Sequence, residues 1–203
     1  MGVAAQRYDL LARLFDYPDE CDYSAMLDRC IDLLAGAYPA AAKLLRPLRE
    51  HVAGMTLDQI QELYTRTFDI NPVCSLEVGW HIYGEDYARG ALLVKMREQL
   101  REMNLPESQE LPDHLTHVLA LLGRLDGEES DEFAARYVIP GLQKMLDGMQ
   151  DTEIPYRALL ETVMAVVKQD HDVEAVPPRE RKGDPPGWKS QLPVFGNQGC
   201  PKR

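Results

Sequence analysis

Long apolar segments are missing from this sequence. No run approaches the ~20 consecutive apolar residues that a membrane-spanning helix needs. The first 18 residues have an apolar pattern that Arg7, Asp9 and Arg13 interrupt, whereas the apolar core of a signal peptide is unbroken. The sequence therefore predicts a cytoplasmic protein with no stable membrane association.

Sequence signatures of catalysis are also scarce. The chain contains no glycine-rich phosphate loop and no G-x-S-x-G nucleophile turn. Its four cysteines, Cys21, Cys30, Cys74 and Cys200, include no C-x-x-C pair, so neither a zinc site nor an iron–sulfur site is indicated. Cys30 falls on the apolar face of an expected helix, where a thiol packs as a small hydrophobic side chain. These absences favour a protein that binds its partner without catalysing a reaction.

Positive charge is in short supply. The chain has 22 Lys and Arg residues against 33 Asp and Glu residues, which gives a formal net charge of −11. Proteins that bind nucleic-acid phosphates or anionic lipid need basic surfaces. We therefore expect no nucleic-acid partner, and instead a partner that presents basic or apolar segments.

The residues that are abundant favour helices. Hydrophobic residues make up 45% of the chain, with Leu, Ala and Met prominent and few β-branched residues. Apolar side chains recur at helical spacing, and Thr56 with Gln59 forms a capping-box pattern. The sequence predicts an all-α, single-domain bundle of about eight helices. We expect them at residues 3–16, 24–37, 39–52, 56–67, 75–104, 112–125, 130–150 and 154–169, with glycines interrupting the fifth and Pro140 the seventh.

The composition changes near the end of the chain. Residues 1–170 carry the helical periodicity and form the expected helical domain. Residues 171–203 are rich in Pro, Gly and charge and have no periodicity, which predicts a mobile tail. Its apolar residues, such as Trp188 and Phe195, are either incidental or dock on the body or on a partner.

The strongest candidate site lies at the start of an expected helix. Pro112, Asp113 and His114 precede Leu115, and proline is favoured in a first helical turn. One interpretation is capping, because Asp113 could accept hydrogen bonds from free backbone N–H groups. The other is a groove for a partner peptide, flanked by Asp113 and His114. Asp113 would then pair with a basic residue of the peptide. His114, near the surface, would form a hydrogen bond there, and its charge would change near neutral pH.

An aromatic stripe follows residue 75. Trp80, Tyr83 and Tyr87 have the spacing i, i+3, i+7, which is more typical of a core face than of a ligand site. His81 lies beside the stripe and is interpreted as a hydrogen-bonded core histidine.

Charged residues on the same segment predict an ion pair. Glu85 and Arg89 are four residues apart, so they could pair on one helix face and stabilise the helix.

A metal site is the main catalytic alternative. Asp113, His114 and His117 could hold a divalent ion, which would indicate a metal-dependent hydrolase. However, the H-E-x-x-H pattern is absent, and no second helix offers an E-x-x-H partner. A stable structural subunit of a redox complex is a second alternative.

Four stretches of the chain resemble the nitrate reductase assembly chaperones. This family, also called delta subunits, falls within the maturation chaperones of molybdoenzymes. The first stretch is the Leu-rich helix that ends at residues 17–20, and the second is residues 64–69. The third, residues 75–90, contains Trp80, His81, Tyr83, Gly84, Glu85, Arg89 and Gly90. The fourth runs Glu110-Leu111-Pro112-Asp113-His114-Leu115.

The resemblance implies an all-helical cytoplasmic chaperone for the catalytic subunit of a molybdoenzyme. Such a chaperone binds the subunit's N-terminal segment, often a twin-arginine signal or its remnant. It holds the apo-subunit open until the bis-guanine-dinucleotide molybdenum cofactor is inserted. It then dissociates and is not retained in the mature enzyme. The chaperone has no resident cofactor, and any contact with the molybdenum cofactor would be transient, during client loading.

The family ties Pro112, Asp113 and His114 to peptide recognition, and we extend that role to Leu115. Residues 70–74 depart from the family pattern, and the last third of the chain matches it more loosely. These departures leave the client open among nitrate, selenate, chlorate, perchlorate, dimethyl sulfide and ethylbenzene oxidoreductases.

Overall fold

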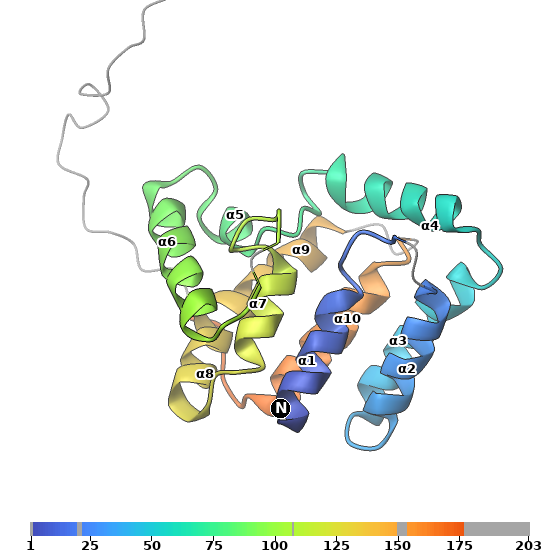
Figure 1. The fold of residues 1–203 in the computed structure, drawn as a ribbon, viewed down its shortest axis with the longest axis horizontal. Coiled ribbons are helices and arrows are strands. Elements are labelled where there is room, and N and C mark those ends of the chain that lie inside the picture. Colours follow the sequence, from blue (N-terminus) through green and yellow to red (C-terminus); the bar gives the residue numbers. More distant parts are fainter. Residues whose placement is uncertain (1, 20–21, 107, 150–153, 177–203) are drawn as a thin grey trace, which may run out of the picture.

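A computed structural model describes residues 2–19, 22–106, 108–149 and 154–176, and these ranges form a helical bundle (Figure 1). The all-α prediction is confirmed. In chain order the elements are α1 (Val3–Arg13), α2 (Tyr23–Ala35), α3 (Pro39–Val52), α4 (Leu57–Tyr64), η1 (Thr65–Asp69), α5 (Val78–Tyr83), α6 (Tyr87–Glu102), α7 (Leu115–Leu122), α8 (Gly127–Phe133), η2 (Ala134–Val138), α9 (Ile139–Gly148) and α10 (Arg157–Asp170). The segments η1 and η2 are π-helical.

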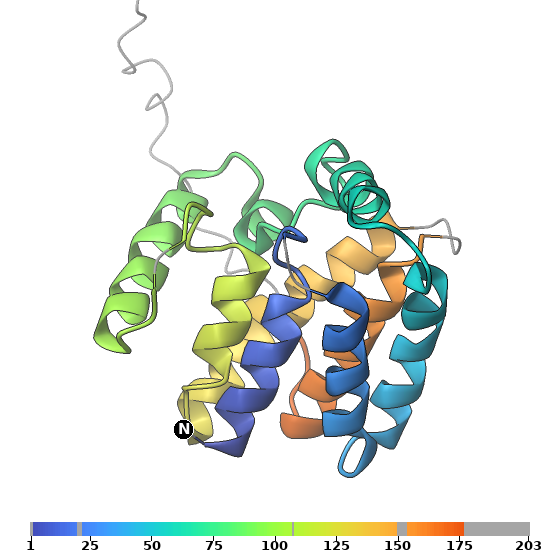
Figure 2. The ribbon, with the colours of Figure 1, turned by 45° about the vertical axis from the view of Figure 1, so that its right-hand side comes forward.

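The bundle is built around three helices. In both ribbon views α1, α7 and α10 lie at the centre, with α2 and α3 on one side and α6 and α8 on the other (Figures 1 and 2). Helix α10 packs against α3 and α9, and α1 packs against α2 and α7. The buried apolar side chains of these helices form one cluster, which includes Cys30 as predicted. Burial raises the pKa of the Cys30 thiol to about 12, so this cysteine is a packing residue.

Local sequence signals explain several helix ends. The predicted capping box at the start of α4 is present: the Thr56 hydroxyl accepts from Gln59 N, and the Gln59 side chain accepts from Thr56 N. The long helical segment expected over residues 75–104 is two helices, α5 and α6. Between them Gly84 has φ +60° and ψ −133°, a conformation that is essentially restricted to glycine.

Two predicted helix starts were wrong. The helix expected from Pro112 begins at Leu115. The helix expected to be capped by Ser130 begins at Gly127 with Asp126 at the N-cap position, and Ser130 is buried inside it. The predicted interruption at Pro140 is present: α8 runs through the π-helical turn η2 into α9, and Pro140 lies in the first turn of α9. A proline lacks the N–H that a regular helix needs and crowds the preceding turn.

The start of the predicted tail is held on the body. The imidazole of His171 pairs with Asp131 at 2.7 Å, and the backbone N–H of Val176 donates to Ala135 O at 2.9 Å. The rest of the tail, residues 177–203, lies outside the described residues, together with Cys200 and the apolar residues singled out there.

No helix in the described ranges combines the length and the apolar character that crossing a membrane would need.

Candidate functional site

A short backbone crossing joins the two candidate segments of the sequence. The N–H of Val78 donates to Asp113 O, and the N–H of Leu115 donates to Leu76 O, each at 2.8 Å. Glu77 and His114 face each other between these bonds as an isolated antiparallel bridge. The start of α5 and the start of α7 are therefore fixed side by side, although more than 30 residues separate them in the sequence.

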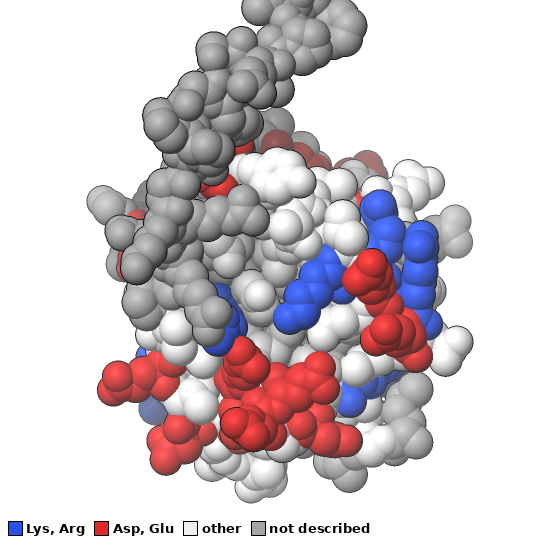
Figure 3. Space-filling model, turned by 90° about the vertical axis from the view of Figure 1, so that its left-hand side faces the viewer, with Lys and Arg blue, Asp and Glu red and all other residues white. Residues whose placement is uncertain are grey.

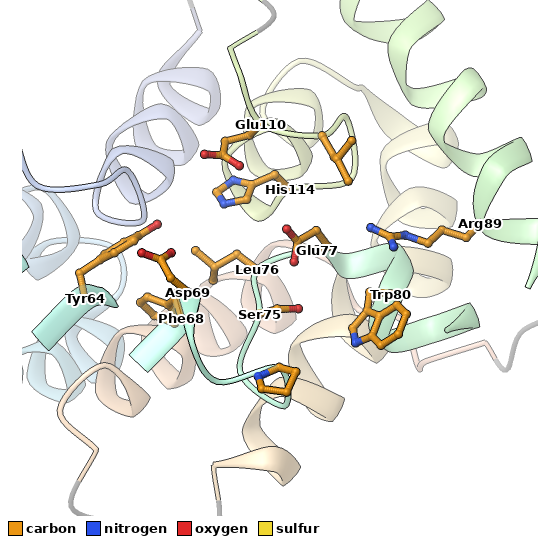
Figure 4. A pocket seen from close by; sticks show the side chains of 12 residues that line it. Tyr64, Phe68, Asp69, Ser75, Leu76, Glu77, Trp80, Arg89, Glu110 and His114 are labelled. Atoms are coloured by element: carbon orange, nitrogen blue, oxygen red, sulfur yellow. The ribbon is translucent and has the colours of Figure 1, made fainter. Parts of the chain in front are cut away.

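A pocket of about 470 Å³ opens beside this crossing, where η1, the loop before α5 and the loop before α7 meet (Figure 4). Its walls combine aromatic, aliphatic and charged side chains. The residues that line it are Tyr64, Phe68, Asp69, Pro72, Ser75, Leu76, Glu77, Trp80, Arg89, Glu110, Leu111 and His114.

Three carboxylates from three separate segments converge on the pocket. Asp69 ends η1, Glu77 precedes α5, and Glu110 lies in the loop before α7. Two of these charges act on Tyr64: its pKa is raised, chiefly by burial and further by the negative charges of Asp69 and Glu110. The Tyr64 hydroxyl donates to Phe15 O at 2.9 Å, which fixes the ring at the pocket edge. Carboxylates that line one concave space give it a negative potential, which favours a positively charged ligand.

His114 lies at the pocket wall and is more buried than the sequence suggested. Only 5% of the residue is exposed, and it occupies the N-cap position of α7. Its Nδ1 accepts from the backbone N–H of Thr116 at 3.4 Å and lies 2.8 Å from the Thr116 hydroxyl. An accepting Nδ1 places the imidazole proton on Nε2. That Nε2–H donates to no acceptor among the described residues, so it is available to an acceptor in the pocket.

The charge state predicted for His114 was wrong. Burial lowers its pKa to about 4; the negative charge of Glu77 opposes this shift, and His117 adds to it. The imidazole is therefore neutral at pH 7, and its charge does not change near neutrality.

Asp113 is not at the surface. The residue is 0% exposed, and it does not cap a helix. Its Oδ2 accepts from Arg89 Nε at 3.1 Å, while Oδ1 has no hydrogen-bond partner among the described residues. A carboxylate that is buried and already paired is poorly placed to bind the basic side chain of a partner, so the direct pairing expected from the sequence does not fit its position.

Arg89 and Trp80 form the far wall of the pocket. The Arg89 guanidinium carbon lies 5.7 Å from the centre of the Trp80 ring, a cation–π contact. The ion pair expected between Arg89 and Glu85 is not formed. Glu85 lies in the turn before α6, not on the helix that carries Arg89, and the carboxylate that Arg89 contacts is Asp113.

The remaining residues of the two candidate segments shape the scaffold. Leu115 and Pro112 are buried, and Leu115 is part of the core. The Nε2 of His81 bonds to Ser75 O at 2.7 Å, and burial lowers the pKa of this histidine, as expected for a core residue. Tyr83 packs against the core, while Gly90 faces solvent.

The proposed metal triad is not assembled. His117 Nδ1 bonds to Leu111 O at 2.9 Å, and its Nε2 accepts from Ser108 N at 3.4 Å, so both ring nitrogens are occupied. Asp113 is paired with Arg89. Across the described part of the chain, no group of three His, Cys, Asp or Glu residues is arranged to hold a metal ion.

Sequence reasoning missed the three pocket carboxylates as site residues. Asp69 and Glu110 stand in stretches that resemble the chaperone family, but nothing local distinguishes them from ordinary surface carboxylates. Glu77 likewise lies in the third of those stretches, residues 75–90, and no local feature distinguishes it either. The backbone crossing brings Glu77 close to the loop that carries Glu110, and η1 adds Asp69 to the same pocket.

Comparisons with known proteins agree with the fold. A family model described as nitrate reductase delta subunit matches residues 34–158, more than half of the chain. Among the solved structures that match is a candidate redox enzyme maturation protein from Archaeoglobus fulgidus, with a TM-score of 0.54 and 19% sequence identity. The match covers 83% of this chain and 96% of that one, and at this identity it shows a shared fold. A comparison with curated proteins finds no match.

Proposed function

This chain belongs to the nitrate reductase delta subunit family, and on that premise we propose that it is a maturation chaperone for the catalytic subunit of a nitrate reductase or a related molybdoenzyme. It acts in the cytoplasm and without catalysis. It binds the N-terminal segment of the catalytic subunit and keeps the apo-subunit competent for cofactor insertion. It leaves before the enzyme is complete. The molybdenum cofactor belongs to the client, and the chaperone needs no resident cofactor.

The observation that carries the proposal is the chemistry of the pocket. Asp69, Glu77 and Glu110 surround a concave space with an apolar floor that includes Phe68 and Leu76 (Figure 4). A peptide with a basic side chain next to apolar ones matches this lining, because the carboxylates attract the cation and the floor takes up apolar surface.

Main-chain recognition adds a second contact. The Nε2–H of His114 can donate to a carbonyl of the bound segment, and the low pKa of this histidine keeps the ring neutral at pH 7. Because every residue of a peptide has a main-chain carbonyl, a neutral donor can bind peptides of any sequence. It therefore contributes affinity, while the carboxylates select the basic side chain.

The test is calorimetric titration of the full chain with a synthetic peptide from the N-terminus of the catalytic subunit encoded in the same genome. We expect saturable binding that Glu77→Gln weakens about fivefold, the effect of losing one partly solvated charge pair. Glu85→Gln is the matched control, because Glu85 is exposed and lies outside the pocket lining. The proposal fails if the peptide does not bind, or if the two variants behave alike.

A second measurement separates a chaperone from a stable subunit. The catalytic subunit is purified with its cofactor fully loaded, and this chain is sought in the preparation. We expect it to be absent from the loaded enzyme and present with the apo-subunit. Stoichiometric retention in the loaded enzyme would identify a structural subunit instead.

A further inference from the structure

The carboxylate of Asp113 has no access to the pocket. The residue is fully buried, and the atoms around it belong to the protein. A Cβ added to Gly79 would lie only 2.6 Å from Asp113 Oδ2, so this carboxylate is packed directly against the backbone of α5. A residue in this position can influence a ligand only through a neighbouring group.

That neighbouring group is Arg89. Asp113 Oδ2 accepts from the Nε of Arg89, and the Trp80 ring lies against its guanidinium. A guanidinium carries five N–H donors in a rigid plane. Its two terminal NH₂ groups have no hydrogen-bond partner among the described residues, and the side chain lines the pocket. Asp113 and Trp80 thus hold one edge and one face of the guanidinium and leave its outer edge unoccupied.

The charges of the pocket are arranged in order. Figure 4 shows Asp69 and Glu110 at one end, Glu77 in the middle, and Arg89 beside Trp80 at the other end. A bound segment therefore meets hydrogen-bond acceptors at one end and a fixed donor at the other.

We propose that Arg89 is the specificity-determining residue that contacts the bound segment, and that Asp113 is a positioning residue that acts through it. The inference rests on the proposed function and deepens it. The pocket binds a segment in one direction, with a basic side chain near Asp69 and Glu110 and an oxygen acceptor at Arg89. The acceptor is either a main-chain carbonyl or an acidic side chain, since a guanidinium binds both.

The experiment titrates full-length variants with the same N-terminal peptide. Arg89→Lys keeps the positive charge beside Asp113 but loses the planar set of donors, and we expect it to weaken binding about tenfold. Arg49→Lys is the matched control, because Arg49 also pairs with a carboxylate, that of Asp28, although through two hydrogen bonds and outside the pocket. Unchanged affinity in Arg89→Lys overturns the proposal and leaves the proposed function intact.

The positioning role of Asp113 has its own readout. Asp113→Asn is measured alone and together with Arg89→Gln. The double variant removes both charges of the pair, so it leaves no unpaired buried charge and should still fold. We expect Asp113→Asn to weaken binding only when Arg89 is present, a non-additive pair. In a Trp188→Phe background Trp80 is the only tryptophan, and Asp113→Asn should shift its fluorescence as the guanidinium leaves the ring. Additive losses with unchanged Trp80 emission contradict the positioning role.

Peptide variants distinguish the two acceptors. Each Asp and Glu of the peptide is replaced by its amide. One replacement that weakens binding to the wild type, but not to the Arg89→Gln/Asp113→Asn protein, identifies an acidic side chain at Arg89. If no replacement matters while Arg89→Lys still weakens binding, the acceptor is a main-chain carbonyl. Both results support the proposal.

Failure of the proposed function can be distinguished from failure of this inference. If the N-terminal peptide does not bind the wild type, peptides that tile the rest of the catalytic subunit are titrated. Binding of any tile that depends on Arg89 supports this inference although the proposed client segment is wrong. If no tile binds, both the proposed function and this inference are wrong.

Discussion

Gly79 has no side chain, and this leaves room for the Asp113 carboxylate behind the pocket. Asp113 occupies the space that a Cβ at residue 79 would need, and a Leu92 methyl lies 3.1 Å from the same point. We expect Gly79→Ala to lower the free energy of unfolding by about 1–3 kcal/mol, the usual effect of overpacking a filled site. Displacing Asp113 should also release Arg89 and weaken peptide binding.

The control for this prediction is Gly90→Ala on the neighbouring helix α6. Nothing lies within 4 Å of a Cβ placed there, so alanine should be neutral or stabilise by up to about 1 kcal/mol. Urea denaturation of both variants gives the comparison. Equal effects at the two glycines would mean that Asp113 moves aside without cost.

His114 makes stability depend on pH in a defined direction. Its pKa falls from the ordinary value of 6.5 to about 4 on folding, so the unfolded chain binds the proton more readily. The contribution of His114 to the free energy of unfolding is fully present above pH ~6.5 and is lost as the pH falls towards 4. At pH 4.5 the expected loss is about 2–3 kcal/mol.

The comparison protein for that prediction is His114→Asn. Asparagine is uncharged and is a preferred N-cap residue, so it can accept from Thr116 N and keep the start of α7 intact. Denaturation with urea at pH 7, 5.5 and 4.5 should show a steeper loss of stability in the wild type than in the variant. Parallel curves would show that His114 is solvated when the protein is folded.

At the scale of elements, the turn between α5 and α6 sets the position of Arg89 relative to Trp80. Gly84 adopts φ +60° and ψ −133° there, and an alanine would be strained in that region by about 1–3 kcal/mol. We expect Gly84→Ala to destabilise the protein by that amount and to weaken peptide binding. Gly36→Ala at the end of α2 is the control, because Gly36 has φ −74° and free space around it. Thermal unfolding and peptide titration of both variants test the prediction.

Helices were predictable where their signals are local. The capping box at Thr56, the break at Gly84 and the irregular turn before Pro140 all follow from residues within one or two turns. The start of α7 was not predictable in this way. Hydrogen bonds to Leu76 and Val78, from a distant part of the chain, hold residues 113–115 extended and delay the helix.

The candidate site was predictable in location but not in chemistry. The sequence singled out Asp113 and His114, and both lie at the pocket or directly behind it. Their burial could not be foreseen, because it depends on the packing of α5 against the start of α7. Burial keeps His114 neutral, hides Asp113, and leaves Arg89 as the exposed end of the pair.

At the scale of the whole molecule, negative charge extends well beyond the pocket. Figure 3 shows carboxylates gathered on the side of the body where α8 lies, and the sequence of that helix, GEESDEF, is mostly acidic. Helix α7 separates this surface from the pocket: His114 at its start lines the pocket, and α8 follows its other end. Charges that distant are screened at physiological salt, where the Debye length is about 8 Å.

The two groups of carboxylates should therefore act on different steps of peptide binding. Neutralising Glu128, Glu129 and Glu132 on α8 removes long-range attraction, so we expect a slower association rate at low salt and little change at 0.15 M or above. Neutralising Asp69 and Glu110 in the pocket removes direct contacts, so we expect faster dissociation, about tenfold, at every salt concentration. Stopped-flow kinetics from 20 to 500 mM salt separate the two. If the α8 variant instead loses affinity at high salt, the peptide touches α8 itself, and its binding surface extends along α7 beyond the pocket.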